Sequence, residues 1–127
     1  MISENDISKL VVDLCFKIHT QYGPGLFESV YEEVMYYELT NEYGLLVQRQ
    51  PLIPVTWKNV KMELGFRADL IVENEVLVEL KSVETLAAVH PKQVLTYLKL
   101  TGLKLGLLLN FNEALLKNGI KRIANNL

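Results

Sequence analysis

The fold of this 127-residue chain is decided by one stretch, FRADLIVENEVLVELK, which spans residues 66–81. Apolar residues alternate on both sides of Asn74, and this pattern predicts two antiparallel strands joined by a tight turn. Asp69, Glu79 and Lys81 interrupt these otherwise apolar strands. Charged groups in the middle of a sheet are costly to bury unless they are paired or bind a metal ion. The three residues therefore mark a candidate site.

The length of the turn decides whether the two carboxylates share a face of the sheet. A two-residue turn at 74–75 would place Asp69 and Glu79 on opposite faces. A three-residue turn at 73–75 would place Asp69 directly opposite Glu79, with both side chains on one face. We expect a turn of odd length, or a bulge that restores the same register.

Elements outside this hairpin are predicted from apolar periodicity and from glycine and proline positions. Asn5 or Asp6 is expected to cap the first helix, and Gly23-Pro24 to end it. Pro51 and Pro54 indicate an edge strand or a bend. The predicted elements are helix 7–18, helix 27–43, strand 45–50, strand 60–73, strand 76–81, helix 92–101, strand 103–109 and a short final helix after Asn112.

This order predicts an α/β fold with a mixed sheet of about four strands and helices on both sides. Half of the residues are hydrophobic and 22% are charged, which is typical of a folded protein. The length fits a single domain over residues 1–127. In the second helix, Glu32, Glu33, Glu38 and Glu42 are expected to form a solvated acidic side.

Composition excludes several classes of protein. The net charge of −2 excludes strong non-specific nucleic-acid binding through bulk charge. The single cysteine, Cys15, excludes an internal disulfide and fits a reducing cytoplasm. No apolar run is long enough to cross a membrane, and residues 1–10 lack a signal-peptide pattern. We expect a cytoplasmic protein that does not bind membranes.

Two motifs resemble a known superfamily. Asp69 followed by Glu79-Leu80-Lys81 is similar to the PD-(D/E)XK nuclease signature, with Ala68 in the place of the proline. Gln93 and Tyr97 are similar to the Q-x-x-x-Y motif of the RecB-like branch. This resemblance implies a restriction-endonuclease-like core.

A third motif narrows the resemblance. Residues Gly25 to Tyr31 are similar to the signature of the small bacterial GxxExxY proteins, a branch of the same superfamily. With this motif the resemblance covers roughly residues 7–123 of the chain.

The candidate catalytic residues are Glu28, Asp69, Glu79 and Lys81. Asp69 and Glu79 offer the hard oxygen ligands that suit Mg²⁺ or Mn²⁺. The resemblance adds the backbone carbonyl of Leu80 as a metal ligand and brings Glu28 to the acidic cluster. Lys81 would orient the attacking water or neutralise developing charge.

Four further residues are candidates for substrate binding or for supporting the site. Tyr31 lies one helical turn from Glu28, and Arg67 is placed to reach a phosphate. Gln93 and Tyr97 share a helix face and would hold the site or touch the substrate. The predicted function is metal-dependent hydrolysis of nucleic-acid phosphodiesters, with DNA favoured over RNA.

Two alternatives stay open at this stage. Asp69, Glu79 and Lys81 would form only a cross-strand ion-pair network if they lay on an exposed sheet face. A nuclease-fold module with weak or no catalysis, binding nucleic acid or a protein partner, would also fit the acidic net charge. A small nuclease core often needs a second subunit to grip a duplex, so a homodimer or an accessory protein partner is compatible with either function.

Overall fold

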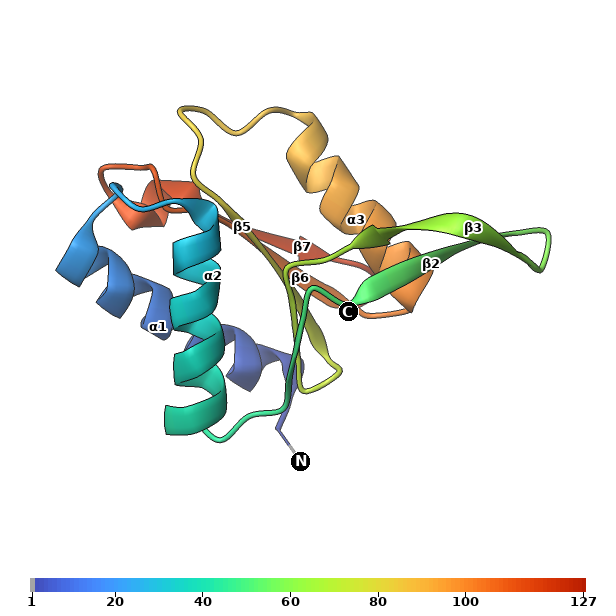
Figure 1. Cartoon of the computed structure of the whole chain (residues 1–127), viewed down its shortest axis with the longest axis horizontal. Coiled ribbons are helices and arrows are strands. Elements are labelled where there is room, and N and C mark those ends of the chain that lie inside the picture. The colour runs from blue at the N-terminus through green and yellow to red at the C-terminus, as the bar shows by residue number, and fades with distance from the viewer. Residues whose placement is uncertain (1) are drawn as a thin grey trace.

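A computed structural model describes residues 2–127 and shows a mixed sheet between two layers of helices (Figure 1). Within these residues the sheet has five strands in the order β1-β4-β5-β6-β7, and β2 and β3 form a separate two-stranded ribbon. The helices are α1 (Glu4–Tyr22), α2 (Glu28–Tyr37) and α3 (Val89–Thr101). The strands are β1 (Val47–Arg49), β2 (Leu52–Trp57), β3 (Val60–Arg67), β4 (Leu70–Val72), β5 (Val76–Lys81), β6 (Leu105–Asn110) and β7 (Ile120–Ala124).

The expected α/β class with helices on both sides of a mixed sheet is confirmed. β5 and β6 run parallel at the centre, and the other neighbours in the sheet pair antiparallel. α1 and α2 cover one face of the sheet, and α3 covers the other (Figure 1). At Gly106 on β6, a Cβ atom would lie 2.6 Å from the side chain of Val94, so the glycine allows α3 to approach the sheet closely.

The ends of the helices differ in detail from the sequence predictions. Ser3, and not Asn5 or Asp6, caps α1, because its hydroxyl accepts a hydrogen bond from the Asp6 N–H at 3.2 Å. Gly23 follows α1 with φ 67°, a conformation that glycine adopts without strain. α2 continues into a π-helical turn, η1 (Glu38–Glu42), before Gly44.

The predicted final helix is wrong. Only a short 3₁₀ turn, η2 (Leu116–Gly119), forms there, and the chain then enters β7. Asn112 therefore caps no helix. β7 pairs antiparallel with β6, where it gives the central strand its second neighbour. The sheet thus has five strands within residues 2–127, where about four were expected.

The predicted continuous strand 60–73 is broken at Ala68 and Asp69, where the chain leaves β2 and joins the main sheet. The pairing register nevertheless continues across the break, because Leu52 pairs with Arg67 and Arg49 pairs with Leu70. β1–β2 and β3–β4 therefore form one long antiparallel ribbon that bends at Gln50-Pro51 opposite Ala68-Asp69. Pro51 has no N–H for the ladder, and Gln50 has φ 53°, so the bend lies where regular pairing fails.

The turn between β4 and β5 has the expected odd length. Val72 pairs with Val76, and Leu70 pairs with Val78, which leaves a three-residue turn at 73–75. Continued by one residue, this register places Asp69 opposite Glu79.

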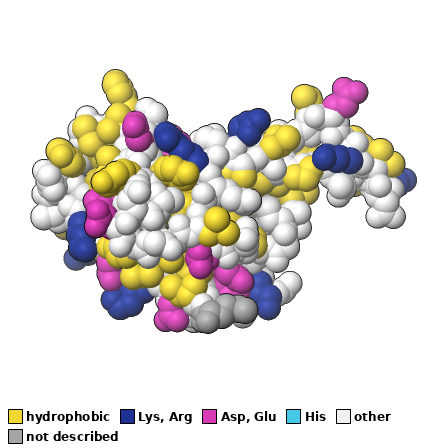
Figure 2. Space-filling model, turned by 60° about the horizontal axis from the view of Figure 1, so that its bottom comes forward, with side chains coloured by type: hydrophobic (Ala, Val, Ile, Leu, Met, Phe, Trp, Pro, Cys, Tyr) yellow, Lys and Arg dark blue, Asp and Glu magenta, His cyan; other side chains and the backbone are white. Residues whose placement is uncertain are grey.

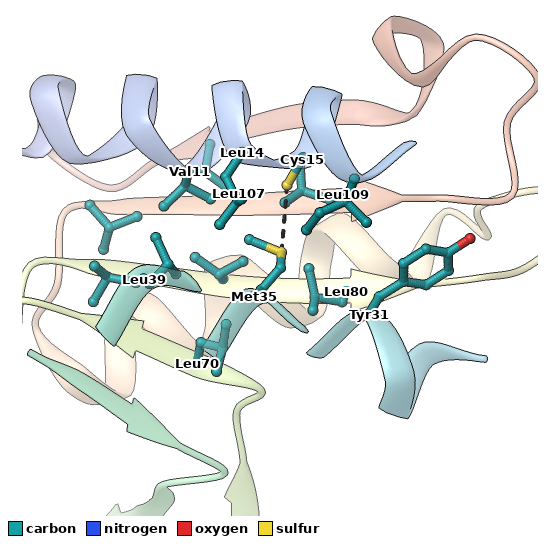
Figure 3. Close-up of a cluster of buried hydrophobic side chains, with 14 of the residues drawn as sticks. Val11, Leu14, Cys15, Tyr31, Met35, Leu39, Leu70, Leu80, Leu107 and Leu109 are labelled. Carbon is teal, nitrogen blue, oxygen red and sulfur yellow. Dashed lines mark hydrogen bonds between the residues drawn. The ribbon is translucent and has the colours of Figure 1, made fainter. Parts of the chain in front are cut away.

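The larger core lies between the sheet and the α1–α2 layer. Figure 3 shows Leu70, Leu80, Leu107 and Leu109 from the sheet packed against side chains of the two helices. The Cys15 Sγ lies 3.6 Å from the Met35 Sδ, and burial raises the pKa of the Cys15 thiol. This cysteine is therefore a packing residue. Within residues 2–127 no helix combines the length and the hydropathy that a membrane span requires.

Candidate active site

Asp69 and Glu79 lie on the same face of the sheet, the one covered by α3. Strand alternation on β5 turns Val78 and Leu80 toward α1 and α2, and it turns Leu77 and Glu79 toward α3. Glu79 is only 7% exposed, and Asp69 is half-buried. The predicted juxtaposition of the two carboxyl groups is confirmed.

Backbone hydrogen bonds lock the pair together. The Asp69 N–H donates to the Glu79 Oε1 at 3.0 Å, and the Leu80 N–H donates to the Asp69 Oδ2 at 2.8 Å. The regular pairing of β4 with β5 ends at Leu70 and Val78. Beyond that point, the two carboxylates accept the hydrogen bonds of the next backbone N–H groups. The positions of both side chains are fixed by the backbone.

Burial is the main influence on both carboxyl groups. Burial and then the negative charge of Asp69 raise the pKa of Glu79 to about 8. Burial also raises the pKa of Asp69, with a smaller contribution from the charge of Glu32, while the Leu80 N–H, Lys81 and Gln50 oppose the shift. Two carboxylates in one desolvated place disfavour each other's ionisation, so the pair provides a strong electrostatic attraction for a cation.

Leu80 also presents its backbone carbonyl on this side. In a strand, the N–H and C=O of one residue point to the same edge, and the Leu80 N–H is bonded to Asp69. The next residue, Lys81, points its carbonyl the other way, where it accepts from the Phe111 N–H at 2.9 Å. The Leu80 carbonyl is therefore directed to the Asp69 edge of β5, as a metal ligand would require.

Lys81 is close enough for its positive charge to lower the pKa of both Asp69 and Glu79. Among residues 2–127, however, neither carboxylate has an ion-pair partner within 4.0 Å. The cross-strand ion-pair network that the sequence left open is therefore not formed, and its premise of an exposed face is wrong because Glu79 is buried.

A second group of polar residues supports Asp69, and the sequence analysis missed it. Gln50 Nε2 donates to the Asp69 Oδ1 at 3.2 Å and to the Glu32 Oε1 at 2.5 Å. The Gln50 N–H also donates to the Asp69 carbonyl at 2.8 Å. Arg49 Nε pairs with the Glu32 Oε2 at 2.9 Å. Glu32, expected on a solvated side of the helix, is instead buried, because α2 turns it toward the bend of the ribbon.

One signal in the sequence points to Gln50: it is a polar residue directly before a proline that ends a strand. Its left-handed backbone, at φ 53°, is uncommon for a residue with a side chain. That conformation lets the N–H, the C=O and the side-chain amide of one residue all form hydrogen bonds at the bend.

The structure places Glu28 apart from the two strand carboxylates. Its Oε2 accepts from the Ser82 N–H at 3.2 Å, just beyond the end of β5. Within residues 2–127, no three Asp, Glu, His or Cys side chains gather closely enough to form a metal-binding group. The expected meeting of Glu28 with Asp69 and Glu79 is therefore not formed, because Glu28 lies at the start of α2 and binds the Ser82 N–H beyond the end of β5.

Tyr31 is completely buried, and its ring stacks on Phe111 with a centroid distance of 4.1 Å. Its hydroxyl donates to the Gly23 carbonyl at 2.5 Å and accepts from the Leu26 N–H at 3.2 Å. Tyr31 thus fixes the loop between α1 and α2, which leads directly to Glu28 at the start of α2. Because its side chain is fully buried, Tyr31 supports the position of this loop and does not contact a substrate.

The helix α3 brings Tyr97 to the site and leaves Gln93 exposed. Burial, and then the charges of Glu79 and Asp69, raise the pKa of Tyr97. Its ring also contacts Phe66, with centroids 5.2 Å apart. Gln93 lies one turn earlier on the same helix face and forms no side-chain hydrogen bond within residues 2–127. Arg67 is exposed, and its Nη1 donates to the Gln50 carbonyl at 2.8 Å.

These observations agree with the comparison to known families. The model of the PD-(D/E)XK nuclease superfamily matches residues 5–123. The chain belongs to this superfamily. Searches of the curated proteins and of the solved structures gave no significant match. Membership in the PD-(D/E)XK nuclease superfamily indicates a nuclease-type function and nucleic acid as the class of ligand.

The donor set of this PD-(D/E)XK protein fits a divalent metal ion. Asp69 and Glu79 supply carboxylate oxygens from adjacent strands, and the Leu80 carbonyl points to the same edge. A small hard cation such as Mg²⁺ needs few protein ligands, because it keeps several of its waters. Two carboxylates without an ion-pair partner give such a cation a favourable electrostatic place.

Proposed function

We propose that the chain is a metal-dependent nuclease that hydrolyses phosphodiester bonds, with DNA as its substrate. The observation that carries the proposal is the buried pair of Asp69 and Glu79, held together by backbone hydrogen bonds on the α3 face. A structural ion pair would need a cation within contact distance, and neither carboxylate has one within residues 2–127. The superfamily match supports the same class of reaction.

Asp69, Glu79 and the Leu80 carbonyl would hold Mg²⁺ or Mn²⁺. When bound, the ion supplies Lewis-acid stabilisation of phosphoryl oxygens and lowers the pKa of its water ligands. Lys81 places a positive charge beside both carboxyls, where it can neutralise charge that develops on the phosphate or orient the attacking water. Arg67, exposed next to the bend, is available to a phosphate oxygen.

In this proposal the remaining predicted residues support the site. Tyr97 packs beside the two carboxyls, and Gln93, on the same face of α3, faces a bound substrate. Glu28 contributes from the end of β5, and Tyr31 fixes the loop that positions it. The motifs that contain these residues support assignment to the GxxExxY proteins of the RecB-like branch.

We also propose a bacterial and cytoplasmic setting. The GxxExxY motif supports the first, since its resemblance is to small bacterial proteins. The single buried cysteine supports the second, since it fits a reducing compartment.

The test is a cleavage assay with purified protein, supercoiled DNA and Mg²⁺ or Mn²⁺. Nicking or degradation is expected, and chelation of the metal should stop it. Lys81→Ala should lose at least about 100-fold in activity, because it removes a positive charge that acts on both carboxyls. Lys104→Ala, which changes an exposed lysine outside the site, is the matched control and should keep full activity.

Equal activity in Lys81→Ala and the parent protein would contradict the proposal. The same assay with single-stranded RNA tests the choice of substrate. Faster cleavage of RNA than of DNA would support phosphodiester hydrolysis and contradict the choice of DNA as substrate.

A module that binds nucleic acid or a protein partner without catalysis is the second candidate. The net charge of −2 and the separation of Glu28 from Asp69 and Glu79 favour it. Calorimetric titration with Mn²⁺, combined with the cleavage assay, distinguishes the two candidate functions. Metal binding that Asp69→Asn abolishes, combined with no cleavage of DNA or RNA, would contradict the nuclease and favour the second candidate.

A further inference from the structure

The β2–β3 ribbon projects from the body of the molecule as an arm, residues 52–67 (Figures 1 and 2). All of β3 is exposed, and so are the two turn residues that connect it to β2. At the base of the arm, Ile53 is buried in one apolar cluster with Val94 and Tyr97 of α3. The arm therefore has a base that is fixed on α3 and a tip that is open to solvent.

A tight turn fixes the backbone at the tip of the arm. Trp57 pairs with Val60, which leaves a two-residue turn, and Lys61 takes the next position of the ladder. The turn residues Lys58 and Asn59 have φ of 51° and 66°, the left-handed conformation that suits the twist of a two-stranded ribbon. The tip therefore places Trp57, Lys58 and Lys61 within one short segment of regular hairpin.

The arm is irregular between its tip and its base. Residues 62–64 of β3 lie opposite the single residue Val55 of β2, so the pairing register shifts there. The reach of the arm is therefore measured along β2, from Leu52 at the base to Lys58 at the tip. Six steps along an extended strand span about 20 Å. This length equals about six base pairs along the axis of a DNA duplex.

The arm is basic, although the chain as a whole is acidic. Its cations are Lys58, Lys61 and Arg67, and its single acidic residue is Glu63. The arm thus has a net charge of +2, which leaves −4 for the rest of a chain whose total is −2. Within residues 2–127, none of the three cations has an ion-pair partner within 4.0 Å. The arm therefore offers a local positive charge to a polyanion.

Exposed apolar side chains accompany this charge, and Figure 2 shows basic and hydrophobic groups together along the arm. Trp57, the only tryptophan of the chain, is 68% exposed, and Leu52 and Leu64 are also mostly exposed. A protein partner would account for the apolar surface and would leave the excess of cations unexplained. A nucleic acid accounts for both, because cations contact its phosphates and apolar groups contact its base edges.

We propose that the arm binds duplex DNA, that Lys58 and Lys61 contact its phosphates, and that Trp57 at the tip enters the major groove. The inference rests on the proposed function for the identity of the ligand. The major groove of B-DNA admits a two-stranded ribbon. Arg67 ends the arm two residues before Asp69. One duplex can therefore contact both the arm and the carboxyl pair, with the tip about six base pairs from the base of the arm.

Equilibrium binding with a chelator present tests the arm without any cleavage. The probe is a fluorescein-labelled 20-base-pair duplex, followed by anisotropy at low salt. The double variant K58Q/K61Q removes two charges and keeps long polar side chains. It should bind at least about tenfold more weakly, and the slope of log K against log salt should become shallower by about two, because each phosphate contact contributes about 0.9.

The matched control is the double variant K117Q/K121Q, which removes two exposed lysines outside the arm. It makes the same change in net charge and should bind DNA as the parent protein does. Equal weakening in the two double variants would overturn the proposal, because bulk charge would then account for binding. Unchanged binding by K58Q/K61Q would also overturn it and would leave the arm to a protein partner.

The intrinsic fluorescence of the protein reports on the tip directly, because Trp57 is its only tryptophan. Addition of the unlabelled duplex should change the intensity and the wavelength of Trp57 emission. Emission that stays constant while anisotropy shows binding would contradict entry of the tip into the groove. Tighter binding of single-stranded DNA of the same sequence would contradict the duplex as ligand.

Failure of this inference is distinguishable from failure of the proposed nuclease. Binding that depends on Lys58 and Lys61, in a protein that does not cleave DNA, would contradict the nuclease and support the arm. Cleavage by a K58Q/K61Q protein that binds DNA as the parent does would support the nuclease and overturn the arm. In an active protein, the double variant should raise KM by about tenfold with little change in kcat, because the arm contacts DNA away from the reacting phosphate.

Discussion

The two faces of β5 carry different kinds of side chain. Toward α1 and α2 the strand presents Val76, Val78 and Leu80, all buried in the larger apolar core. Toward α3 it presents Leu77, which is buried, and then Glu79 and Lys81. Alternate residues of the same strand therefore lie in two very different environments.

The two faces differ in whether they carry polar groups. The apolar face has no polar group that needs a partner, so changes there should act on folding. The α3 face carries two carboxyl groups that burial makes costly to ionise, so changes there should act on function and on the pH dependence of stability. Substitutions on the apolar face should lower the stability of the protein and leave its activity unchanged. Substitutions on the α3 face should lower the activity with little loss of stability, and both results together would confirm this division.

The largest effect is expected from Asp69→Asn, which removes one of the two carboxylates. Under the proposed function we expect DNA cleavage to fall by roughly 10³-fold, because this carboxylate would hold the metal ion that stabilises charge on the reacting phosphate. Asparagine keeps an acceptor for the Leu80 N–H, so the melting temperature should change little. Full activity in this variant would show that the pair has no part in the reaction.

The apolar face should respond in the opposite way. Leu107→Ala on β6 should lower the free energy of unfolding by about 2–5 kcal/mol, because it leaves a cavity in the core of Figure 3. Denaturant unfolding measures this loss. The turnover of the molecules that remain folded should match that of the parent protein. A loss of turnover in those folded molecules would contradict the division of roles between the two faces.

The pH dependence of stability tests the buried pair without any assay of activity. The folded pKa of Glu79 is about 8, above its ordinary value of 4.5, so the native state holds a proton that the unfolded state loses between these values. Metal-free protein should therefore lose stability as the pH rises from about 4.5 to about 8. Glu79→Gln keeps the side chain neutral and should remove this loss.

Thermal melts with chelator present give the comparison. At pH 8 the Glu79→Gln variant should melt several degrees above the parent protein, since 1 kcal/mol corresponds to roughly 3–6 °C for a chain of this size. At pH 5 the two should differ much less. A constant difference between the variants at all pH values would show that Glu79 titrates normally.

The smallest effect is expected at Gln50, which positions Asp69 from the bend of the ribbon. Gln50→Ala removes the amide that bridges Asp69 and Glu32, so we expect kcat to fall by about tenfold with little change in KM. Gln48→Ala, an exposed glutamine two residues earlier, is the control and should have no effect. Equal losses in the two variants would indicate general weakening of β1.

Alternation along residues 66–81 predicted the hairpin, and the expectation of an odd turn length predicted its register and the meeting of Asp69 with Glu79. These contacts are local, and one turn length determines them. The glycines after α1 and α3 likewise marked the true ends of those helices, at Gly23 and Gly102.

The parts that could not be predicted depend on contacts between distant segments. Glu32 looks solvated on a helical projection, and only the packing of α2 beside the Gln50 bend buries it. The break at Ala68-Asp69 arises because Pro51, 17 residues earlier in the chain, cannot continue the ladder. β7 is a short exposed strand that forms by pairing with β6, and its own sequence carries little signal.

The central claim is that Asp69, Glu79 and the Leu80 carbonyl hold a divalent cation. A crystal structure of the protein soaked in Mn²⁺, with anomalous diffraction recorded, tests it most directly. We predict one strong anomalous peak bonded to an oxygen of each carboxylate and to the Leu80 carbonyl. Carboxyl groups that accept only from the Asp69 and Leu80 N–H groups, with no peak beside them at saturating Mn²⁺, would contradict the account.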